Sequence, residues 1–425
     1  LYLLDEFDVI NSEQHFPIFV FSNFKNWNEF KHNYRKQILP RIDETLPKEL
    51  SSFVEKLKKI NNAKEKITKA LSYIIHNYVY LGDWRPVRGS HIPRPLNEIV
   101  ETKYGDCKDF SLLLTKILKE AGVEASMALI FRGTLPPYYS KIRQTPTLGA
   151  FNHMIVAVKN EDHFDYYDPT NMTVIVRSIA IDISQRYVLV LDEYSQNLFF
   201  TPKIDPEVNK LNLDIRIDEI NFKSNLVDAR AKYYINGPEA HYLLYSLLNN
   251  PLPVAEMRLR DRIFSGERIK DFKTLKFPKK QRILPKEGLE AIYSIEYTGP
   301  VIETTLGKGV IDVRSTGFAR LPSPEDIKPD RINDLWLNVP LTNHRILRFP
   351  MNKIEGQLPE KCEAANSFFQ RTREFTQTDN EILRMDTLVV TNPIVPNSIL
   401  LSSKFIKDLE KADRCDDPVV LIPRK

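Results

Sequence analysis

The chain changes from helical to strand periodicity about one third of the way along, and this change most limits what it can fold into. Apolar residues recur at helical spacing in four segments, and the last of these ends at Gly122, a residue type typical of the position after a helix. The four apolar stripes are Trp27, Phe30, Tyr34 and Ile38; Leu50, Phe53, Val54, Leu57 and Ile60; Ile67, Leu71, Ile74, Ile75 and Tyr78; and Phe110, Leu113, Leu114, Ile117, Leu118 and Ala121.

Strands are predicted for most of the remaining chain. The first predicted strands are 125–131, 151–158, 164–168 and 187–191. Beyond residue 203, apolar and polar residues alternate, most clearly in 211–217 and 291–297, and one predicted helix at 238–249 interrupts them. More strand-like segments follow to the end of the chain. Helices that are grouped before the strands, instead of alternating with them, indicate an α+β protein.

The length of 425 residues allows two or three domains at roughly 100–200 residues each. We expect residues 1–22 to be the tail of an upstream β domain or an added strand, and 23–205 to form the α+β core. Residues 206–325 are expected to form a β-rich domain. A proline-rich, charged stretch marks a boundary there. Residues 326–425 then form a second β-rich domain or a continuation, and β-sandwich-like packing is expected for this half.

Composition excludes several classes of protein. The 60 basic and 56 acidic residues give a net charge of +4, which is too balanced to indicate a nucleic-acid partner. No apolar run approaches the ~18 residues of a membrane span. The chain has neither of the glycine-rich motifs that bind nucleotide phosphates. It begins at Leu1 instead of Met, so we expect a fragment or a trimmed mature form, and with the β-rich flanks this favours a periplasmic or secreted protein.

The three cysteines are Cys107, Cys362 and Cys415. Their wide separation excludes a Cys-x-x-Cys metal site and argues against a disulfide framework, and the odd count leaves at least one free thiol. Cys362 and Cys415 have no histidine nearby in the sequence and are expected to be structural or incidental. Cys107 is therefore the cysteine to consider for chemistry.

Cys107 lies where the fourth helix is predicted to begin. Unpaired N–H groups at a helix N-terminus favour the thiolate form, which is the nucleophile. Cys107 shares the core-facing side of this helix with Phe110 and Leu114, so it should point at the sheet that the helix covers. The charges of Asp106 and Asp109 oppose thiolate formation. A basic partner is therefore required to make this thiol reactive.

His153 and Asp168 lie on two consecutive predicted strands. A four-residue turn at 159–162 would place them directly opposite each other, with Cβ atoms roughly 5 Å apart. The aspartate could then accept a hydrogen bond from one imidazole nitrogen while the other nitrogen faces Cys107. This is the arrangement of a nucleophile, a base and an orienting group. A register shift of one residue would remove it.

Each of these residues also has an ordinary structural explanation. A single cysteine is often an inert core residue, a histidine in a strand is often structural, and an aspartate before Pro169 commonly starts a turn. The joint pattern of the three residues is what points to nucleophilic catalysis. His91 and His163 lack a matching partner in the sequence, and we expect both at the surface.

The three residues lie in segments that resemble the core of the transglutaminase-like superfamily. These segments are Tyr104-Gly-Asp-Cys-Lys-Asp109, Phe151-Asn-His153 and Tyr167-Asp-Pro-Thr170. Residues 94–100 and 118–125 are similar to a bacterial subgroup in which β-rich domains flank this core. The resemblance covers about residues 23–200, and it implies a papain-like fold with helices packed on an antiparallel sheet.

The resemblance assigns roles to individual residues. It implies that Cys107 is the nucleophile, His153 the general base and Asp168 the orienting group. The backbone N–H of Cys107 would donate one hydrogen bond to an oxyanion. The indole N–H of Trp84 is a candidate for the second donor, although a packed aromatic residue is the stronger explanation of Trp84. No metal or organic cofactor is required by this chemistry.

The resulting prediction is a cysteine acyl-transfer enzyme that acts as a protease or amidase through a thioester. Its partner would be a peptide, a protein or another amide, including amides linked to glycans or cell walls. One alternative is a protein cross-linking transglutaminase, and another is a non-catalytic binding or scaffold protein built on the same fold. A Cys107 sulfur within ~4 Å of a His153 ring nitrogen, beside an open cleft, would favour the enzyme.

Overall fold

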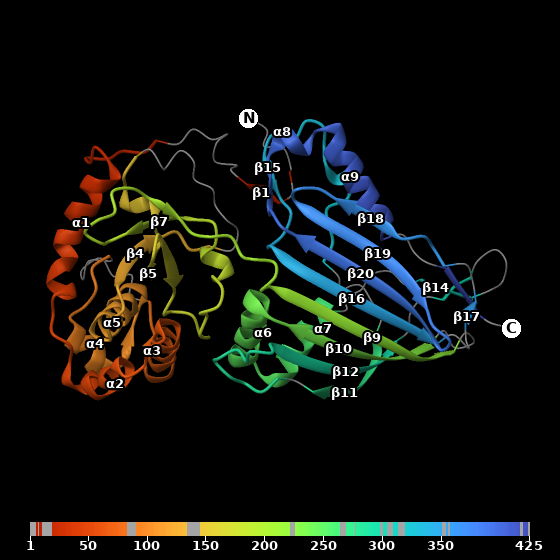
Figure 1. Cartoon of the computed structure of the whole chain (residues 1–425), viewed down its shortest axis with the longest axis horizontal. Helices are drawn as coiled ribbons and strands as arrows, with labels where there is room; N and C mark the ends of the chain where they lie inside the picture. The colour runs from red at the N-terminus through yellow and green to blue at the C-terminus, as the bar shows by residue number, and fades with distance from the viewer. Residues whose placement is uncertain are drawn as a thin grey trace. The chain divides into compact units, whose positions relative to one another are not determined.

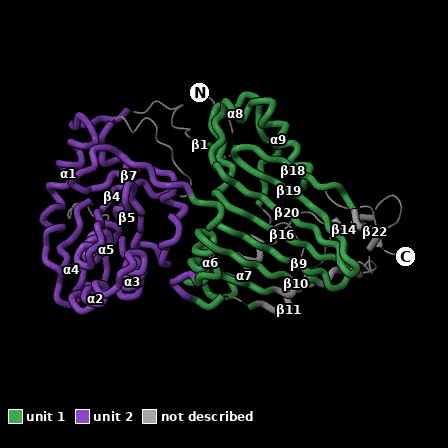
Figure 2. The backbone as a smooth tube through the Cα atoms, viewed as in Figure 1, with its two compact units in different colours: residues 1–10, 204–280, 285–425 green, residues 11–203, 281–284 purple. Residues whose placement is uncertain are grey.

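The chain forms two compact units, shown in Figure 2. The N-terminal unit contains residues 11–203 and 281–284, and the C-terminal unit contains residues 1–10, 204–280 and 285–425. The structure is a computed structural model. It describes residues 6, 8–10, 19–82, 91–133, 145–221, 226–263, 269–276, 278–297, 301–303, 309–312, 319–350, 354–355, 358–416 and 420–423.

The helices of the N-terminal unit confirm the four predicted stripes. They are α1 (Trp27–Ile42), α2 (Lys48–Lys58), α3 (Ala63–Asn77), α4 (Leu96–Thr102) and α5 (Cys107–Glu120). Asparagine side chains cap two of them: Asn26 accepts a hydrogen bond at the start of α1 and Asn62 does so at the start of α3. The stripe residues lie in one buried cluster with the adjoining sheet, so burial of these faces holds the helices in place.

Helix α4 was not predicted from the sequence. The segment is too short to show a full helical period. Its apolar residues Leu96, Ile99 and Val100 are buried at the spacing of a single helical turn. Lys103 ends the helix in the left-handed conformation, with φ of 57°, and the chain then enters the strand that precedes Cys107.

A five-stranded antiparallel sheet forms the other layer of the N-terminal unit, in the order β6-β5-β4-β7-β8 (Figure 1). Its strands are β4 (Ala125–Ile130), β5 (His153–Asn160), β6 (His163–Tyr167), β7 (Tyr187–Val190) and β8 (Phe199–Phe200). Helix α5 packs on β4 and β5. This confirms the predicted strands and the α+β class.

An eight-stranded sheet dominates the C-terminal unit, in the order β11-β12-β10-β9-β16-β20-β19-β18 (Figure 1). Its strands are β9 (Lys210–Asn221), β10 (Leu226–Ile235), β11 (Ile269–Lys276), β12 (Leu289–Tyr297), β16 (Leu341–Pro350), β18 (Cys362–Ala365), β19 (Phe369–Gln377) and β20 (Glu381–Val390). The β9–β16 pair is parallel, and it joins strands from the two expected ranges 206–325 and 326–425 into one sheet.

Two short sheets and four helices complete the described part of the C-terminal unit. Val9–Ile10 pairs with Asp334–Trp336, so the start of the chain adds a strand to a sheet formed much later in the sequence. The remaining elements are β1 (Val9–Ile10), β13 (Val301–Glu303), β14 (Gly309–Asp312), β15 (Asp334–Trp336), β17 (Ile354–Glu355), β21 (Ile394–Val395), β22 (Val420–Pro423), α6 (Gly237–Asn249), α7 (Leu252–Ile263), α8 (Asn397–Leu400) and α9 (Ser403–Arg414).

Helix α9 corrects the prediction of strands up to the end of the chain. Phe405, Leu409 and Ala412 are buried and follow helical spacing, and the Ser402 hydroxyl accepts a hydrogen bond from the Phe405 N–H. The sequence also predicts β-sandwich-like packing in this half. The structure instead builds the core around α9 from strands of the large sheet, the short sheet β1-β15-β21 and helix α8.

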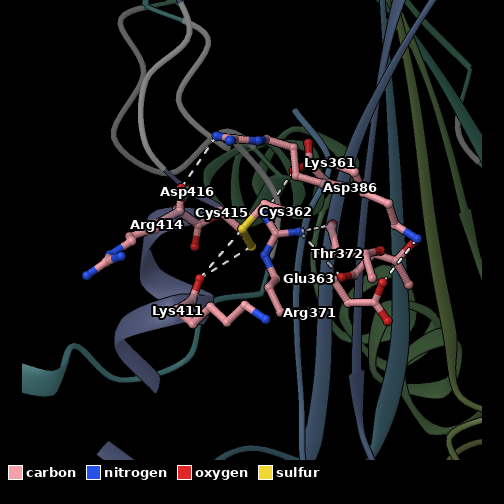
Figure 3. The surroundings of a disulfide bond; sticks show 12 residues. Lys361, Cys362, Glu363, Arg371, Thr372, Asp386, Lys411, Arg414, Cys415 and Asp416 are labelled. Carbon is pink, nitrogen blue, oxygen red and sulfur yellow. Dashed lines mark hydrogen bonds and ion pairs between the residues drawn. A yellow bond between two sulfur atoms is a disulfide. The ribbon is translucent and has the colours of Figure 1, made fainter. Parts of the chain in front are cut away.

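A disulfide joins Cys362, on β18, to Cys415, which follows α9 directly (Figure 3). The argument from sequence separation against a disulfide was therefore wrong for this pair, although the expectation of a structural role holds. They are 53 residues apart in sequence, yet α9 packs along β18 and brings their Cα atoms to 5.4 Å. Sequence separation does not report such tertiary packing. The bond fixes the end of α9 to the edge of the eight-stranded sheet.

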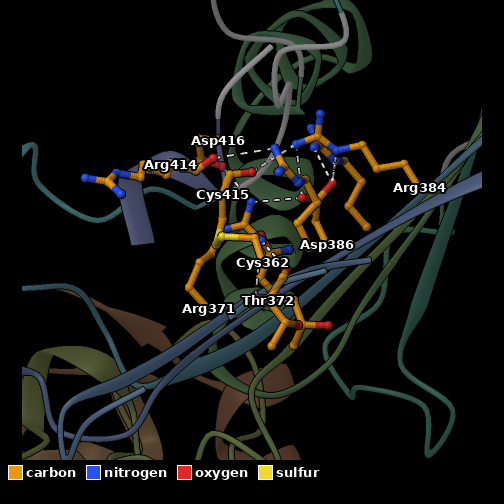
Figure 4. A network of polar contacts seen from close by, with 12 residues as sticks. Cys362, Arg371, Thr372, Arg384, Asp386, Arg414, Cys415 and Asp416 are labelled. Carbon is orange, nitrogen blue, oxygen red and sulfur yellow. Dashed lines mark hydrogen bonds and ion pairs between the residues drawn. A yellow bond between two sulfur atoms is a disulfide. The ribbon is translucent and has the colours of Figure 1, made fainter. Parts of the chain in front are cut away.

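A buried polar network lies beside the disulfide (Figure 4). Arg345, Arg371 and Arg384 all contact the carboxylate of Asp386, at 2.5, 2.9 and 2.8 Å. Burial alone would raise the pKa of Asp386, but the three guanidinium groups outweigh burial and lower it. Arg371 also contacts Asp416 at 2.6 Å, so the network connects the sheet to the end of α9.

A helix that spans a membrane must be both long and apolar. In the described part of the chain, none is both long enough and apolar enough to cross a bilayer.

Candidate active site

The β5–β6 hairpin carries His153, and its register differs from the predicted one. Asn160 pairs with His163 around a two-residue turn, and Glu161 in that turn adopts a positive φ of 50°. The predicted four-residue turn was therefore wrong, and the pairing is displaced by two residues. A two-residue displacement keeps every side chain on its own face of the sheet. Asp168 thus stays on the same face as His153, as a diagonal neighbour.

The side chains of His153 and Asp168 are joined by a hydrogen bond. His153 Nε2 lies 2.9 Å from Asp168 Oδ2, and both residues are buried. Burial alone would lower the pKa of His153, but the Asp168 charge and contacts with Asp168 and Cys107 outweigh it and raise this pKa to about 9. Burial would raise the pKa of Asp168, yet His153 and the Arg132 guanidinium hold it well below its usual range.

Cys107 is the first residue of α5 and is half-buried. Its side chain interacts with His153. Because Nε2 of His153 bonds to Asp168, Nδ1 is the ring nitrogen that remains for the sulfur. Ser111, one turn further along α5, donates a hydrogen bond to the Met154 carbonyl at 3.0 Å. This bond fixes the start of the helix against the strand that carries His153. The structure therefore brings Cys107, His153 and Asp168 together.

The two aspartates that flank Cys107 are each paired with a cation. Asp106 caps the helix by accepting from backbone N–H groups, and its carboxylate also contacts the Lys108 ammonium. Asp109 is buried and accepts two hydrogen bonds from Arg94, one from the backbone N–H at 2.9 Å and one from Nε at 2.8 Å. These contacts offset the negative charge that the sequence places around the thiol.

Arg132 lies just after β4 and contacts Asp168 from a second side. Its Nη1 lies 3.1 Å from Asp168 Oδ2 and its Nε lies 2.6 Å from Asp182 Oδ2. Thr170 also supports the carboxylate, since its N–H and hydroxyl donate to Asp168 Oδ1 at 2.9 and 2.7 Å. Arg132 was not identified from the sequence, because no motif links the end of β4 to the end of β6.

Tyr80 is a second site residue that was not identified from the sequence. The short strand β2 (Val79–Tyr80) pairs with β3 (Tyr104–Gly105), so Tyr80 lies opposite the residue two before Cys107. Burial, together with the nearby Cys107 and Asp106 groups, raises the pKa of Tyr80 to about 12, so the phenol keeps its proton at neutral pH. Gly105 permits the close approach of β3 to the first turn of α5. A Cβ atom there would lie 2.8 Å from Asp109 Cβ and 2.9 Å from the ring of Phe110.

A narrow pocket lies beside Cys107. Its lining includes Tyr80, His91, Cys107, Leu148, Phe151 and His153. Its volume is about 30 Å³, which is enough for a water molecule. His91 is half-buried on this lining, so its expected place at the surface was wrong. Burial and the Lys108 charge lower the pKa of His91.

His163 does not line this pocket. His163 has a side chain that is 62% exposed, as expected for a surface histidine. Trp84, the candidate oxyanion donor, lies outside the described residues. In the described part of the chain, no three or more His, Cys, Asp or Glu side chains are grouped so that they could hold a metal ion.

Comparison with known proteins gives a distant structural likeness. A crystal structure from Parabacteroides distasonis, bearing the name "putative protease", aligns with a TM-score of 0.49 and 13% sequence identity. The alignment covers 96% of this chain and 64% of that protein, so the chain spans less than two thirds of its length. No family model and no curated protein matches this sequence.

Proposed function

We propose that this chain is a cysteine acyl-transfer enzyme with a transglutaminase-like, papain-like core. More particularly, we propose that it hydrolyses amide bonds in peptides, proteins or other amides. The observation that carries the proposal is the buried hydrogen bond between His153 and Asp168, combined with the contact between His153 and a cysteine at the start of a helix. A nucleophile, a base and an orienting carboxylate in this order can perform acyl transfer.

In the proposed first half-reaction, the proton of the Cys107 thiol passes to His153 Nδ1. The thiolate attacks the carbonyl carbon of the substrate, and the carbonyl oxygen becomes an oxyanion. The Cys107 N–H and the Tyr80 hydroxyl would donate hydrogen bonds to this oxygen, with Trp84 as the donor proposed from the sequence. The C–N bond then breaks, and the amine leaves with the proton from His153. The product is a thioester on Cys107.

In the second half-reaction, a water molecule attacks the thioester. His153 removes one proton from this water, a second oxyanion forms, and its collapse breaks the C–S bond. The sulfur recovers the proton from His153, and the carboxylic acid leaves.

A purely structural role explains the site less well. The His153 ring and the Asp168 carboxylate are both buried, and burying such groups is costly unless they are paired. A scaffold protein gains no stability from this pair that apolar residues could not supply. The free thiol beside the pair adds a second reactive group for which a scaffold has no use.

The disulfide between Cys362 and Cys415 supports the proposed location outside the cytoplasm. Disulfides form and persist in oxidising compartments and are rare where thiols are kept reduced. A periplasmic or secreted protein is therefore part of the proposal.

The test is alkylation of Cys107 by iodoacetamide, followed by mass spectrometry between pH 5 and 9 without reductant. Because the other two cysteines form a disulfide, Cys107 is the single thiol available. We expect fast alkylation below pH 7 and a loss of about a hundredfold in H153A. H163A, which changes an exposed histidine, is the matched control and should react like the unmodified protein. If Cys107 reacts no faster than glutathione, the proposal is wrong.

A further inference from the structure

A larger cavity lies next to the pocket of Cys107, within the same unit. Its volume is about 650 Å³, and we call it the aromatic groove because Phe21, Phe24, Phe30 and Tyr34 line it. The groove is much larger than the pocket beside Cys107 and has space for one or two side chains of a peptide. A ligand pocket of several hundred Å³ with apolar walls and a few polar groups is the usual form of a specificity site.

The groove adjoins the proposed catalytic pocket. His91 and Leu148 line both cavities. The Tyr34 hydroxyl donates a hydrogen bond to the His91 carbonyl, which fixes the wall between them. Tyr34 is also close enough to Cys107 that the two groups interact electrostatically. A substrate whose carbonyl reaches Cys107 would therefore place a neighbouring side chain in the groove.

The lining of the groove is neutral. None of the described residues that line it is an aspartate, glutamate, lysine or arginine. Its one titratable imidazole, His91, has a lowered pKa because of burial and the Lys108 charge, so it is neutral at pH 7. A charged side chain would lose hydration in the groove without gaining a partner, which is costly. An apolar side chain would lose no favourable hydration there.

The walls of the groove are held by aromatic contacts. The rings of Phe24 and Phe30 meet edge to face at 5.3 Å, and those of Phe30 and Tyr34 stack at 6.1 Å. Trp27 contacts Phe151, a residue of the catalytic pocket, at 5.5 Å. These contacts preform the groove, and Phe21 on its lining is 85% exposed and free to contact a ligand.

We propose that the aromatic groove binds an apolar, preferably aromatic, side chain of the acyl-donor peptide, within two residues of the bond that is cleaved. This inference rests on the proposed function, since it names the substrate class of the same site. The Ser22, Asn23, Gln37 and Thr147 side chains at the groove supply neutral polar groups for the peptide backbone.

The test uses acetyl-dipeptidyl vinyl sulfones that carry Phe, Asp or Lys at one position and Gly at the other. The Cys107 sulfur bonds to the vinyl carbon β to the sulfone, and the carbon α to the sulfone takes up the thiol proton, so labelling needs no other reactant. Each rate is divided by the iodoacetamide rate of the same protein. We expect the normalised labelling rate of the Phe probe to exceed those of the Asp and Lys probes by about tenfold in at least one position. A tenfold difference corresponds to partial burial of one ring.

Three variants test whether the aromatic groove causes the preference for the Phe probe. F21A changes an exposed ring and should lower the normalised Phe rate by about threefold. Q37K places a cation on the exposed face of α1 at the groove and should raise the Asp rate relative to the Phe rate. H32K adds a cation to the same helix at an exposed residue that does not line the groove, and it should leave the ratio unchanged.

The outcomes separate the two proposals. Equal normalised rates for the Phe, Asp and Lys probes, with fast iodoacetamide labelling, would overturn the groove assignment and leave the proposed function intact. A change of the ratio in H32K as large as that in Q37K would overturn the groove assignment in the same way. Slow labelling by iodoacetamide itself would instead contradict the proposed function.

Discussion

Removing the positive charge of Arg132 should raise the pKa of His153. Both cations share one acceptor, since Asp168 Oδ2 lies 2.9 Å from His153 Nε2 and 3.1 Å from Arg132 Nη1. The two nitrogens are therefore no more than about 6 Å apart. At an effective dielectric constant near 20, two unit charges at that distance repel by about 3 kcal/mol, or about 2 pKa units.

The expected shift is smaller than this value because the Arg132 side chain is 31% exposed and water screens part of its charge. We expect the pKa of His153 to rise by about 1 unit in R132Q. The pKa of His153 in the unmodified protein is about 9, so its titration would move to more alkaline pH. A more basic imidazole gives up its proton less readily to the leaving amine, and amide cleavage should therefore slow.

The assay is an NMR titration of protein labelled at the histidine Cε1 carbons, with H153A to assign the signal. R132K is the matched control, because it keeps a cation at this position, and its shift should be less than half that of R132Q. Near-ultraviolet circular dichroism checks that both variants keep their packing. A pKa of His153 that stays constant or falls in R132Q would refute the reasoning, because it would mean that Arg132 does not compete for Asp168.

Four other predictions follow. Y80F should lower the acylation rate of Cys107 by a p-nitrophenyl ester about a hundredfold, without changing iodoacetamide labelling; an equal rate would exclude the donor role. G105A should lose about 1–3 kcal/mol in urea unfolding, because its Cβ meets Asp109 and Phe110 at 2.8 and 2.9 Å. Reducing the Cys362–Cys415 bond, which closes 53 residues, should cost about 4 kcal/mol in the same assay. The pKa of Asp386 is lowered in the folded state, so its ionised carboxylate stabilises the fold above about pH 4 and this stabilisation is lost on acidification. D386N should therefore lose less stability than the unmodified protein as the pH falls.

The helices and strands of the N-terminal unit could be predicted because their signals are local. Each stripe, such as that of α5, repeats within a single segment, and burial in one cluster then fixes it. Helix α9 shows that the same signal was present and overlooked near the end of the chain, since Phe405, Leu409 and Ala412 have helical spacing. Helix α4 is different, because one turn of helix contains too few apolar positions to display a period.

The partners of the site residues could not be predicted, because they are set by tertiary packing. Arg132 reaches Asp168 because β4 and β6 both pair with β5 in the sheet, and nothing in the sequence near either residue states this. Tyr80 is placed by a two-residue strand pair, which is too short for a pattern. The Cys362–Cys415 disulfide likewise depends on how α9 packs against β18.

The error in the hairpin register shows which inference from the sequence was robust. The turn between β5 and β6 was predicted two residues too long, so Asp168 is not directly opposite His153. The alternation of side chains has a period of two, and an error of two residues therefore keeps both on one face. The long histidine side chain then spans the diagonal and reaches Oδ2 at 2.9 Å. The face of a strand residue is thus a safer inference from sequence than its partner, and an error of one residue would have separated the pair.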